Sequence, residues 1–219
     1  MNPSLFPIPV LAVFLFFLIR AELRKKQQQI YFLKPVATLL VITVLCLSFL
    51  NPLWNLTYSL GILAGLILSF GGDIALMFED RRAFAAGLGL FLMAHIIYLV
   101  TFTLLSPFSS WEYLSMVVLA AAGLFFYMLI RAGLEKMKWP VILYILIISL
   151  MLSRAFSTLF NPDFNAVQGL MIFLGAFSFY LSDMILAVNR FWRPWKYHRI
   201  SLLFYYSGQV LIALAASYF

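Results

Sequence analysis

The chain has 219 residues, of which 64% are hydrophobic and only 11% are charged. A soluble domain has about 45 to 50% apolar residues and about 25% charged ones, so this composition excludes an ordinary soluble protein. Eight membrane-spanning helices of about 20 residues would use about 160 residues and leave about 60 for loops and tails, so no separate soluble domain fits. We therefore expect residues 1–219 to form a single integral membrane domain. The net charge of +7 is interpreted from its positions along the chain.

Apolar stretches separated by short polar breaks predict an all-α protein, a polytopic bundle of eight transmembrane helices. In chain order the predicted helices are 5–20, 35–51, 57–78, 83–105, 112–131, 139–160, 166–188 and 199–219. Helices are favoured over a β-barrel because the stretches are continuously apolar, and because a helix satisfies its own backbone polar groups in lipid. Pro35 and Pro140 are expected to begin two of the helices, since proline suits a first turn. Gly61 and Gly65 form a GxxxG pattern, which favours close helix packing.

Positive charges lie in alternate loops, and this pattern predicts the orientation in the membrane. Of the 15 Lys and Arg residues, 14 follow predicted helices one, three, five and seven: Arg20, Arg24, Lys25, Lys26, Lys34, Arg81, Arg82, Arg131, Lys136, Lys138, Arg190, Arg193, Lys196 and Arg199. The breaks at 52–56, 106–111 and 161–165 contain no Lys or Arg. By the positive-inside rule the basic loops are cytoplasmic and both termini are non-cytoplasmic. The basic excess is therefore a topology signal, and we expect membrane lipids but no nucleic acid as partners.

Strongly polar residues inside the predicted helices are Asp73, His95, Arg154, Asp183 and Gln209. Such residues are costly in hydrocarbon and are functional candidates by default. Asp73 and Asp183 each lie five residues before the predicted end of a helix that runs toward the cytoplasm. That spacing predicts both carboxylates about 7 to 8 Å below the interface. Arg154 falls in the outer half of its helix, where it could extend outward, and we interpret it as structural.

Further polar side chains are predicted near the level of the two aspartates. They are Lys34 at the start of helix two, His95 and Tyr98 on one face of helix four, Tyr144 in helix six, Ser182 beside Asp183, and Tyr205, Tyr206 and Gln209 in helix eight. Of the two tyrosines, Tyr206 is selected as a site residue. Single members also have simpler explanations, because a lone aspartate or His95 can serve helix packing and Lys34 can be one more topology charge. Two aspartates at one depth with several polar neighbours favour a functional cavity, open to the cytoplasm or the inner leaflet.

Two buried carboxylates at one site permit acid and base catalysis without a metal. Burial disfavours a charged carboxylate and two close carboxylates disfavour double ionisation, so one aspartate is expected to hold a proton while the other stays charged. Such a pair can cleave a vinyl ether, because protonation of its β-carbon gives an oxocarbenium ion that a carboxylate stabilises and water attacks. Two histidines and one cysteine cannot build a three-histidine zinc site, so we expect no metal and no cofactor. Serine catalysis through Ser182 and His95 has no sequence signature to support it.

Six short motifs occur in order along the chain. They are KP (Lys34, Pro35), GD with the apolar residues that follow (Gly72 to Met77), FLMAHIIY (Phe91 to Tyr98), YILIISLM (Tyr144 to Met151), SDMILAVNRF (Ser182 to Phe191) and YYSGQVLIA (Tyr205 to Ala213). In these motifs the chain resembles the YhhN family of lysoplasmalogenases, from helix two to helix eight. The resemblance implies an eight-helix membrane hydrolase that cleaves the vinyl ether of lysoplasmenylethanolamine or lysoplasmenylcholine to a fatty aldehyde and a glycerophospho-alcohol. It also implies Asp73 and Asp183, in GD and SD, as the catalytic pair.

Two classes of function remain open from the sequence. The first is this lipid ether hydrolase, which acts on a lysophospholipid and water and in which the remaining polar residues bind or support the substrate. The alternative is a proton-coupled small-molecule or lipid transporter, or a lipid-binding protein, that uses the aspartates as a proton relay. For the hydrolase we expect a multi-pass protein of a bacterial inner membrane, with its active site toward the cytoplasm.

Overall fold

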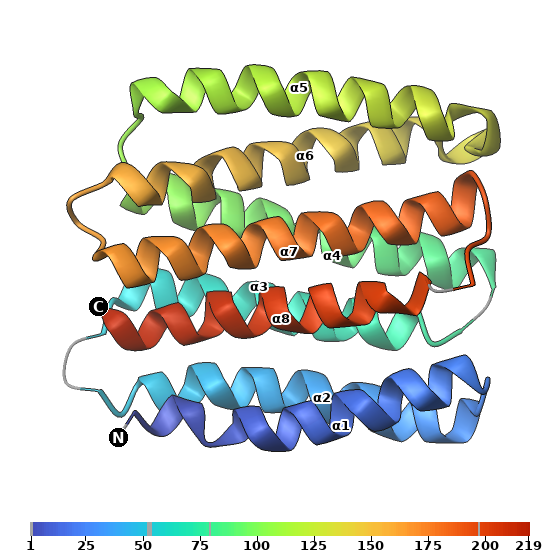
Figure 1. The fold of residues 1–219 in the computed structure, drawn as a ribbon, viewed down its shortest axis with the longest axis horizontal. Coiled ribbons are helices and arrows are strands. Elements are labelled where there is room, and N and C mark those ends of the chain that lie inside the picture. The colour runs from blue at the N-terminus through green and yellow to red at the C-terminus, as the bar shows by residue number, and fades with distance from the viewer. Residues whose placement is uncertain (1, 52–53, 79, 197) are drawn as a thin grey trace.

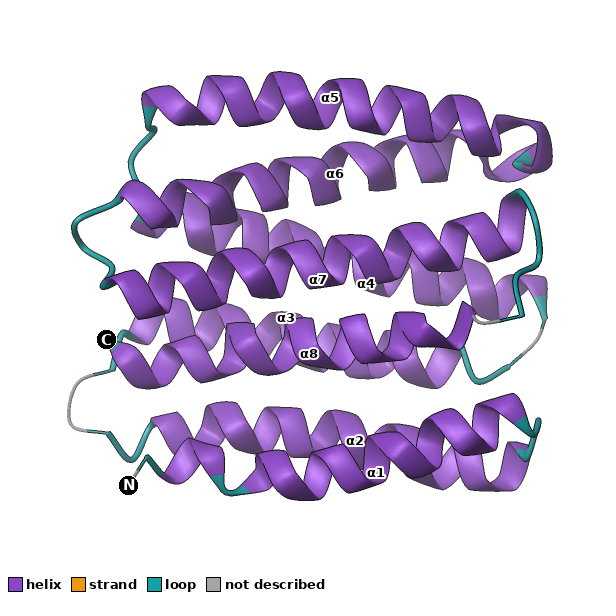
Figure 2. Cartoon of the chain, viewed as in Figure 1, coloured by secondary structure: helices purple, strands orange, loops and turns teal. Residues whose placement is uncertain are grey.

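The computed structural model describes residues 2–51, 54–78, 80–196 and 198–219, and this part of the chain is helical without strands (Figure 2). The helices are α1 Pro7–Leu23, α2 Gln27–Ser48, α3 Leu56–Ala75, α4 Arg81–Leu105, α5 Ser110–Ile130, α6 Lys138–Ser157, α7 Ala166–Phe191 and α8 Ser201–Ala215. Short 3-10 turns on both sides of α8 extend that span to 21 residues, His198–Tyr218. Within the described residues, eight helices are long and apolar enough to cross a membrane. The predicted all-α, eight-span architecture is confirmed, and the protein is a multi-pass integral membrane protein.

The helices form two layers (Figure 1). α1, α8, α7 and α6 lie side by side in one layer, α2, α3 and α4 form the other, and α5 lies at the edge against α6. α1, α3, α5 and α7 all end at the same end of the bundle, and both termini lie at the opposite end. We call the first of these the basic end, because Lys25, Lys136 and Arg193 lie in the connections there and Arg82 lies in the first turn of α4. Which end faces the cytoplasm stays a prediction.

Small residues allow the hairpins α3–α4 and α7–α8 to pack closely, as lipid offers no hydrophobic drive for helix association and close contact must replace it. A methyl group added at Gly65 would collide with the ring of Tyr98 on α4. At the other hairpin, a methyl group at Gly208 would lie 2.7 Å from the backbone oxygen of Gly175. The packing role predicted for the GxxxG pattern is therefore confirmed at Gly65, and α7 and α8 use the same device.

The predicted start of the second helix is wrong. α2 begins at Gln27, and Pro35 lies inside it instead of opening it. The polar residues at its start continue the helix beyond its apolar stretch, and the Gln27 side chain donates a hydrogen bond of 2.6 Å to the backbone oxygen of Met77. Lys34 consequently lies on an inner turn of α2 with its side chain 7% exposed, and not at the surface.

The predicted equal distance of the two aspartates from their helix ends is also wrong. α3 ends at Ala75 and α7 continues to Phe191, so Asp73 lies two residues before its helix end and Asp183 lies eight before its own. The apolar residues after Ala75 form turns that still pack in the core, as Met77 does. Helix ends therefore do not place the carboxylates at one depth, and their relation comes from the cavity described below.

Candidate active site

A cavity of about 370 Å³ at the basic end contains both aspartates in its wall. Asp73 comes from α3, Ser182 and Asp183 come from α7, and Lys34 comes from α2. Odd-numbered helices run in the same direction, so α3 and α7 deliver their carboxylates to the same end of the bundle. We call this space the polar cavity.

Asp73 is surrounded by hydrogen-bond donors and one cation. Its Oδ1 lies 3.4 Å from the Nζ atom of Lys34. Its Oδ2 accepts hydrogen bonds from the Thr38 hydroxyl at 2.7 Å and from the Tyr205 hydroxyl at 2.6 Å. The side chain is only 3% exposed. These partners suit a charged carboxylate, because a buried charge is tolerated when it is paired and hydrogen-bonded.

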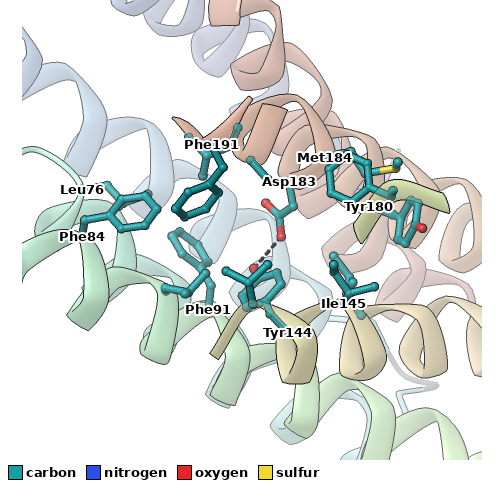
Figure 3. Close-up of a pocket in the computed structure, with 15 residues that line it drawn as sticks. Leu76, Phe84, Phe91, Tyr144, Ile145, Tyr180, Asp183, Met184 and Phe191 are labelled. Atoms are coloured by element: carbon teal, nitrogen blue, oxygen red, sulfur yellow. Dashed lines mark hydrogen bonds between the residues drawn. The ribbon is translucent and has the colours of Figure 1, made fainter. Parts of the chain in front are cut away.

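Asp183 has a different environment, shown in Figure 3. Its Oδ2 accepts a hydrogen bond of 2.5 Å from the hydroxyl of Tyr144 on α6. Of its two oxygens, only Oδ2 has such a donor among the described residues, and no Lys or Arg of this part of the chain lies within 4 Å of either. The carboxyl group borders a second, apolar pocket of about 50 Å³ between α4, α5, α6 and α7. Asp183 therefore lines the polar cavity and the apolar pocket at once.

His95 lies behind this carboxyl group and does not line either space. Its Nε2 is 3.8 Å from Asp183 Oδ2, which is longer than a hydrogen bond. The imidazole packs edge-on against the rings of Tyr144 and Phe179, with centroids 5.4 and 4.5 Å apart. Its position fits a residue that holds Tyr144 and Asp183 in place.

The other residues selected from the sequence lie behind the cavity wall. The Tyr98 hydroxyl donates to Oε1 of Gln209 at 3.2 Å, and both side chains are fully buried. The Tyr206 hydroxyl donates to the backbone oxygen of Lys34 at 3.2 Å and lies 3.2 Å from the Thr38 hydroxyl. Tyr206 therefore supports Lys34 and Thr38 beside Asp73, whereas Tyr98 and Gln209 pair with each other.

The matching family model covers residues 29–216 and describes the YhhN family. The chain belongs to the YhhN family. This YhhN protein is similar to lysoplasmalogenase TMEM86A of Homo sapiens, 30% identical over 158 residues, and to lysoplasmalogenase TMEM86A of Bos taurus, 31% identical over 158 residues. Both matches cover 71% of this chain but only 64% of the relative, so the chain spans less than two thirds of those proteins. No solved structure matches it.

Two residues of the YhhN site were not among those selected from the sequence. Thr38 lies one helical turn after Lys34, so its place on the same face of α2 was a usable signal. From the adjacent tyrosines we selected Tyr206, whereas it is Tyr205 that donates to Asp73 and lines the polar cavity. Nothing local distinguishes two neighbouring tyrosines, because the rotation of α8 decides which one faces α3.

The rim of the polar cavity is rich in charge. Glu22 of α1 pairs with Arg199 at 3.0 Å, and Arg190 of α7 lies over the ring of Phe84 at 4.7 Å. All three charged residues line the cavity. The rim thus offers cations to an anionic group that enters from the basic end.

The donor set of the site does not suit a transition metal. Within the described residues, no three His, Cys, Asp or Glu side chains come together in a way that could hold a metal ion. His198 lines the rim of the polar cavity, whereas His95 lies behind its wall. Around the two aspartates the available chemistry is that of carboxyl groups, hydroxyl groups and one lysine, with Arg190, His198 and Arg199 at the rim.

Proposed function

We propose that this YhhN family protein is a lysoplasmalogenase-like hydrolase that cleaves the vinyl ether of lysoplasmenylethanolamine or lysoplasmenylcholine. One observation carries the proposal: two carboxyl groups, Asp73 and Asp183, line one cavity in unlike surroundings. Unlike surroundings are what divide a carboxyl pair into an acid and a base. The similarity to proteins named lysoplasmalogenase supports the same reaction class.

The contacts suggest a role for each aspartate. Asp73 has Lys34, Thr38 and Tyr205 as partners, and these favour the charged carboxylate. Asp183 borders an apolar pocket, which favours the neutral acid, and its Oδ1 remains available to carry the proton. We therefore assign Asp183 as the proton donor and Asp73 as the carboxylate that stabilises positive charge.

The proposed reaction balances with water as the only co-substrate. Asp183 gives its proton to the β-carbon of the vinyl ether, and the resulting oxocarbenium ion is stabilised by the Asp73 carboxylate. Water adds to the carbon next to the ether oxygen and gives one proton back to the Asp183 carboxylate. The product of this addition is a hemiacetal. The bond from the hemiacetal carbon to the glycerol oxygen then breaks, the proton of the hemiacetal hydroxyl is transferred to the glycerol oxygen, and the fatty aldehyde is released.

The remaining site residues have supporting roles in this scheme. Lys34 keeps Asp73 ionised, and Tyr144 orients Asp183 through its hydroxyl. Ser182 offers a hydroxyl to the headgroup side of the cavity. We place the lipid phosphate at the rim near Arg190 and Arg199, since positively charged side chains attract phosphate.

The reaction is tested by following aldehyde release from purified protein. Vinyl-ether, acyl and saturated-ether lysolipids with the same headgroup are compared side by side. We expect aldehyde from the vinyl-ether lipid only, because a saturated ether has no carbon to protonate. Equal or faster release of fatty acid from the acyl lipid would make the protein a lysophospholipase. Vectorial uptake of lipid by proteoliposomes without product would instead make it a transporter.

We further propose that the basic end faces the cytoplasm of a bacterial cell and that both termini are outside. The proposal rests on the distribution of Lys and Arg among the loops. It is tested by replacing Cys46 with Ser and placing single cysteines at Ser109, Asp163 and Glu135. A reagent that does not cross the membrane should label the first two positions in whole cells and leave the third unlabelled. Labelling of Glu135→Cys alone would invert the orientation.

A further inference from the structure

The apolar pocket beside Asp183 shares a lining residue with a second apolar space. This space, of about 380 Å³, lies between α5 and α6 and is called here the α5/α6 groove. It is lined by Leu119, Ala120, Gly123, Leu124 and Tyr127 of α5 and by Ile142, Ile145, Leu146 and Ser149 of α6. Ile145 lines both spaces, and Figure 3 shows it in the pocket wall on the same helix as Tyr144. The Ile145 side chain is therefore part of the wall of both the pocket at the carboxyl group and the groove.

Gly123 allows α5 to lie close to this side chain. A methyl group added at Gly123 would be 3.0 Å from Cγ2 of Ile145. The backbone of α5 therefore lies directly against the Ile145 side chain. α5 has the lowest buried share of the eight spans, 17%, so the groove lies at the periphery of the bundle.

The sizes of the three spaces restrict where a hydrocarbon chain can go. The apolar pocket, at about 50 Å³, accommodates only a few atoms, since one water molecule already needs about 10 to 15 Å³ of such volume. The lining of the polar cavity includes Lys34, Arg190 and Arg199, and these cations favour the anionic headgroup at that place over a hydrocarbon chain. The α5/α6 groove is apolar and open to the outside, with Leu124 63% exposed and Leu146 54% exposed.

The depth of the α5/α6 groove in the membrane also suits a hydrocarbon chain. On α6 it extends from Ile142 to Ser149, four to 11 residues after the helix start at Lys138. At 1.5 Å per residue this corresponds to about 6 to 17 Å from the basic end, the depth at which lipid chains begin and continue.

We propose that the apolar pocket and the α5/α6 groove form the path of the substrate's single hydrocarbon chain, with Ile145 at the constriction between them. The inference rests on the proposed function and deepens it. The vinyl group lies at Asp183, where the polar cavity meets the apolar pocket, the next carbons lie in the pocket, and the rest of the chain passes Ile145 into the groove. A lipid with one chain suits this arrangement, because one path past Ile145 accommodates one hydrocarbon chain.

The kinetic test uses two neighbouring alanines of α5. Ala120 lines the groove, whereas Ala121 is exposed outside it. We expect Ala120→Phe to lower the ratio of kcat/KM for a long-chain over a short-chain vinyl-ether lysolipid by about tenfold or more, because a chain displaced by about 1 Å can cost about 10²-fold at the reacting bond. Ala121→Phe is the matched control and should leave both activities unchanged. Ala187→Phe, which fills the pocket itself, should lower kcat/KM for both lipids.

A binding test does not depend on turnover. A saturated-ether lysolipid with a photoreactive group at the chain end should label the α5 segment 119–127, and excess unlabelled lysolipid should prevent the labelling. Ala120→Phe should abolish this competed labelling, whereas Ala121→Phe should keep it. Equal ratios for Ala120→Phe and Ala121→Phe, or labelling that is spread over the lipid-facing helices and not competed, would show that the groove holds only bulk lipid and would overturn the inference. Absence of aldehyde release by the unmodified protein would instead contradict the proposed function, and competed labelling would still report the chain path.

Discussion

Two buried groups of charges lie at opposite ends of this bundle and differ in how completely they are paired. At the end away from the basic loops, Arg154 of α6 donates from Nη1 to both carboxylate oxygens of Glu112 on α5, at 2.8 and 2.7 Å. Ser157 donates to the same carboxylate at 2.6 Å, and Arg154 also bonds the Thr103 hydroxyl and the backbone oxygen of Ser106. Arg154 and Glu112 are 2% and 1% exposed. No cavity described above reaches this group.

The comparison separates structural from chemical use of charge in the membrane. Both Arg154 and Glu112 find partners inside the protein, so their group ties peripheral α5 to α4 and α6. The sequence allowed the Arg154 side chain to extend outward, but in the structure it is buried. Its contacts agree with the structural role that we expected for it. Asp73 and Asp183 instead face a cavity, and one oxygen of Asp183 has no donor among the described residues. We call Asp73 and Asp183 the open group, because both carboxyl groups line a cavity where a substrate can reach them. We call Arg154 and Glu112 the sealed group, because both are buried and paired, which suits a role in holding helices together.

The largest expected effect is on catalysis at the open group. Asp73→Asn and Asp183→Asn should each lower aldehyde release by about 10²- to 10⁴-fold, because an amide supplies neither the proton nor the negative charge. Thermal unfolding in detergent checks that each variant is folded. Asp163→Asn, an exposed aspartate at the opposite end, is the control and should keep full activity. Near-normal turnover in either folded cavity variant would remove that aspartate from the mechanism.

Substitutions in the sealed group, Arg154 and Glu112, should lower the stability of the protein and leave its catalytic activity near normal. Arg154→Met should lower the free energy of unfolding by about 3 to 5 kcal/mol, since it leaves Glu112 buried without its cation. The double variant Arg154→Met with Glu112→Leu should recover most of that loss, because an apolar pair avoids the unpaired charge. Denaturant unfolding measures both, and aldehyde release per folded molecule should stay near normal. A folded Arg154→Met protein without activity would abolish the distinction between the two groups.

A smaller effect distinguishes the two neighbouring tyrosines of α8. Tyr205→Phe removes the 2.6 Å hydrogen bond to Asp73. A hydrogen bond to a charged group contributes about 1.5 to 3 kcal/mol, which corresponds to about 10- to 100-fold in rate if it is lost in the transition state. Tyr206→Phe should cost less, because its hydroxyl reaches only Thr38 and the backbone of Lys34. Measurement of kcat and KM for both variants shows which one loses more activity. A larger loss in Tyr206→Phe would contradict the assignment of Tyr205 as the tyrosine that supports Asp73.

The smallest expected effect is that of metal removal. Dialysis against a chelator should leave aldehyde release unchanged, because the polar cavity offers carboxyl and hydroxyl groups and not a transition-metal donor set. Loss of activity that zinc restores would show that the open group works through a metal and not as an acid and base pair.

The number of helices and the candidate aspartates were available from the sequence alone. The cost of polar groups in hydrocarbon applies residue by residue, so a run of apolar residues predicts a span without knowledge of its neighbours. The same cost marks Asp73, Asp183 and Arg154 as unusual wherever the helices lie. The absence of Lys and Arg from alternate loops is equally local, which is why orientation is a sequence prediction.

Contacts between helices distant in the chain were decided only by the tertiary structure. The sequence places Lys34 at a helix start, but the continuation of α2 to Gln27 and its packing on α3 bring that lysine inside, against Asp73. The partner of Arg154 lies 42 residues away on α5, and the choice of Tyr205 over Tyr206 depends on the rotation of α8. Hydrophobicity determines that a helix crosses the membrane, but in a uniformly apolar helix it does not specify which face meets which neighbour, because lipid and protein interior are almost equally apolar. Close packing and the pairing of a few polar groups decide that rotation, and both exist only once the helices are together.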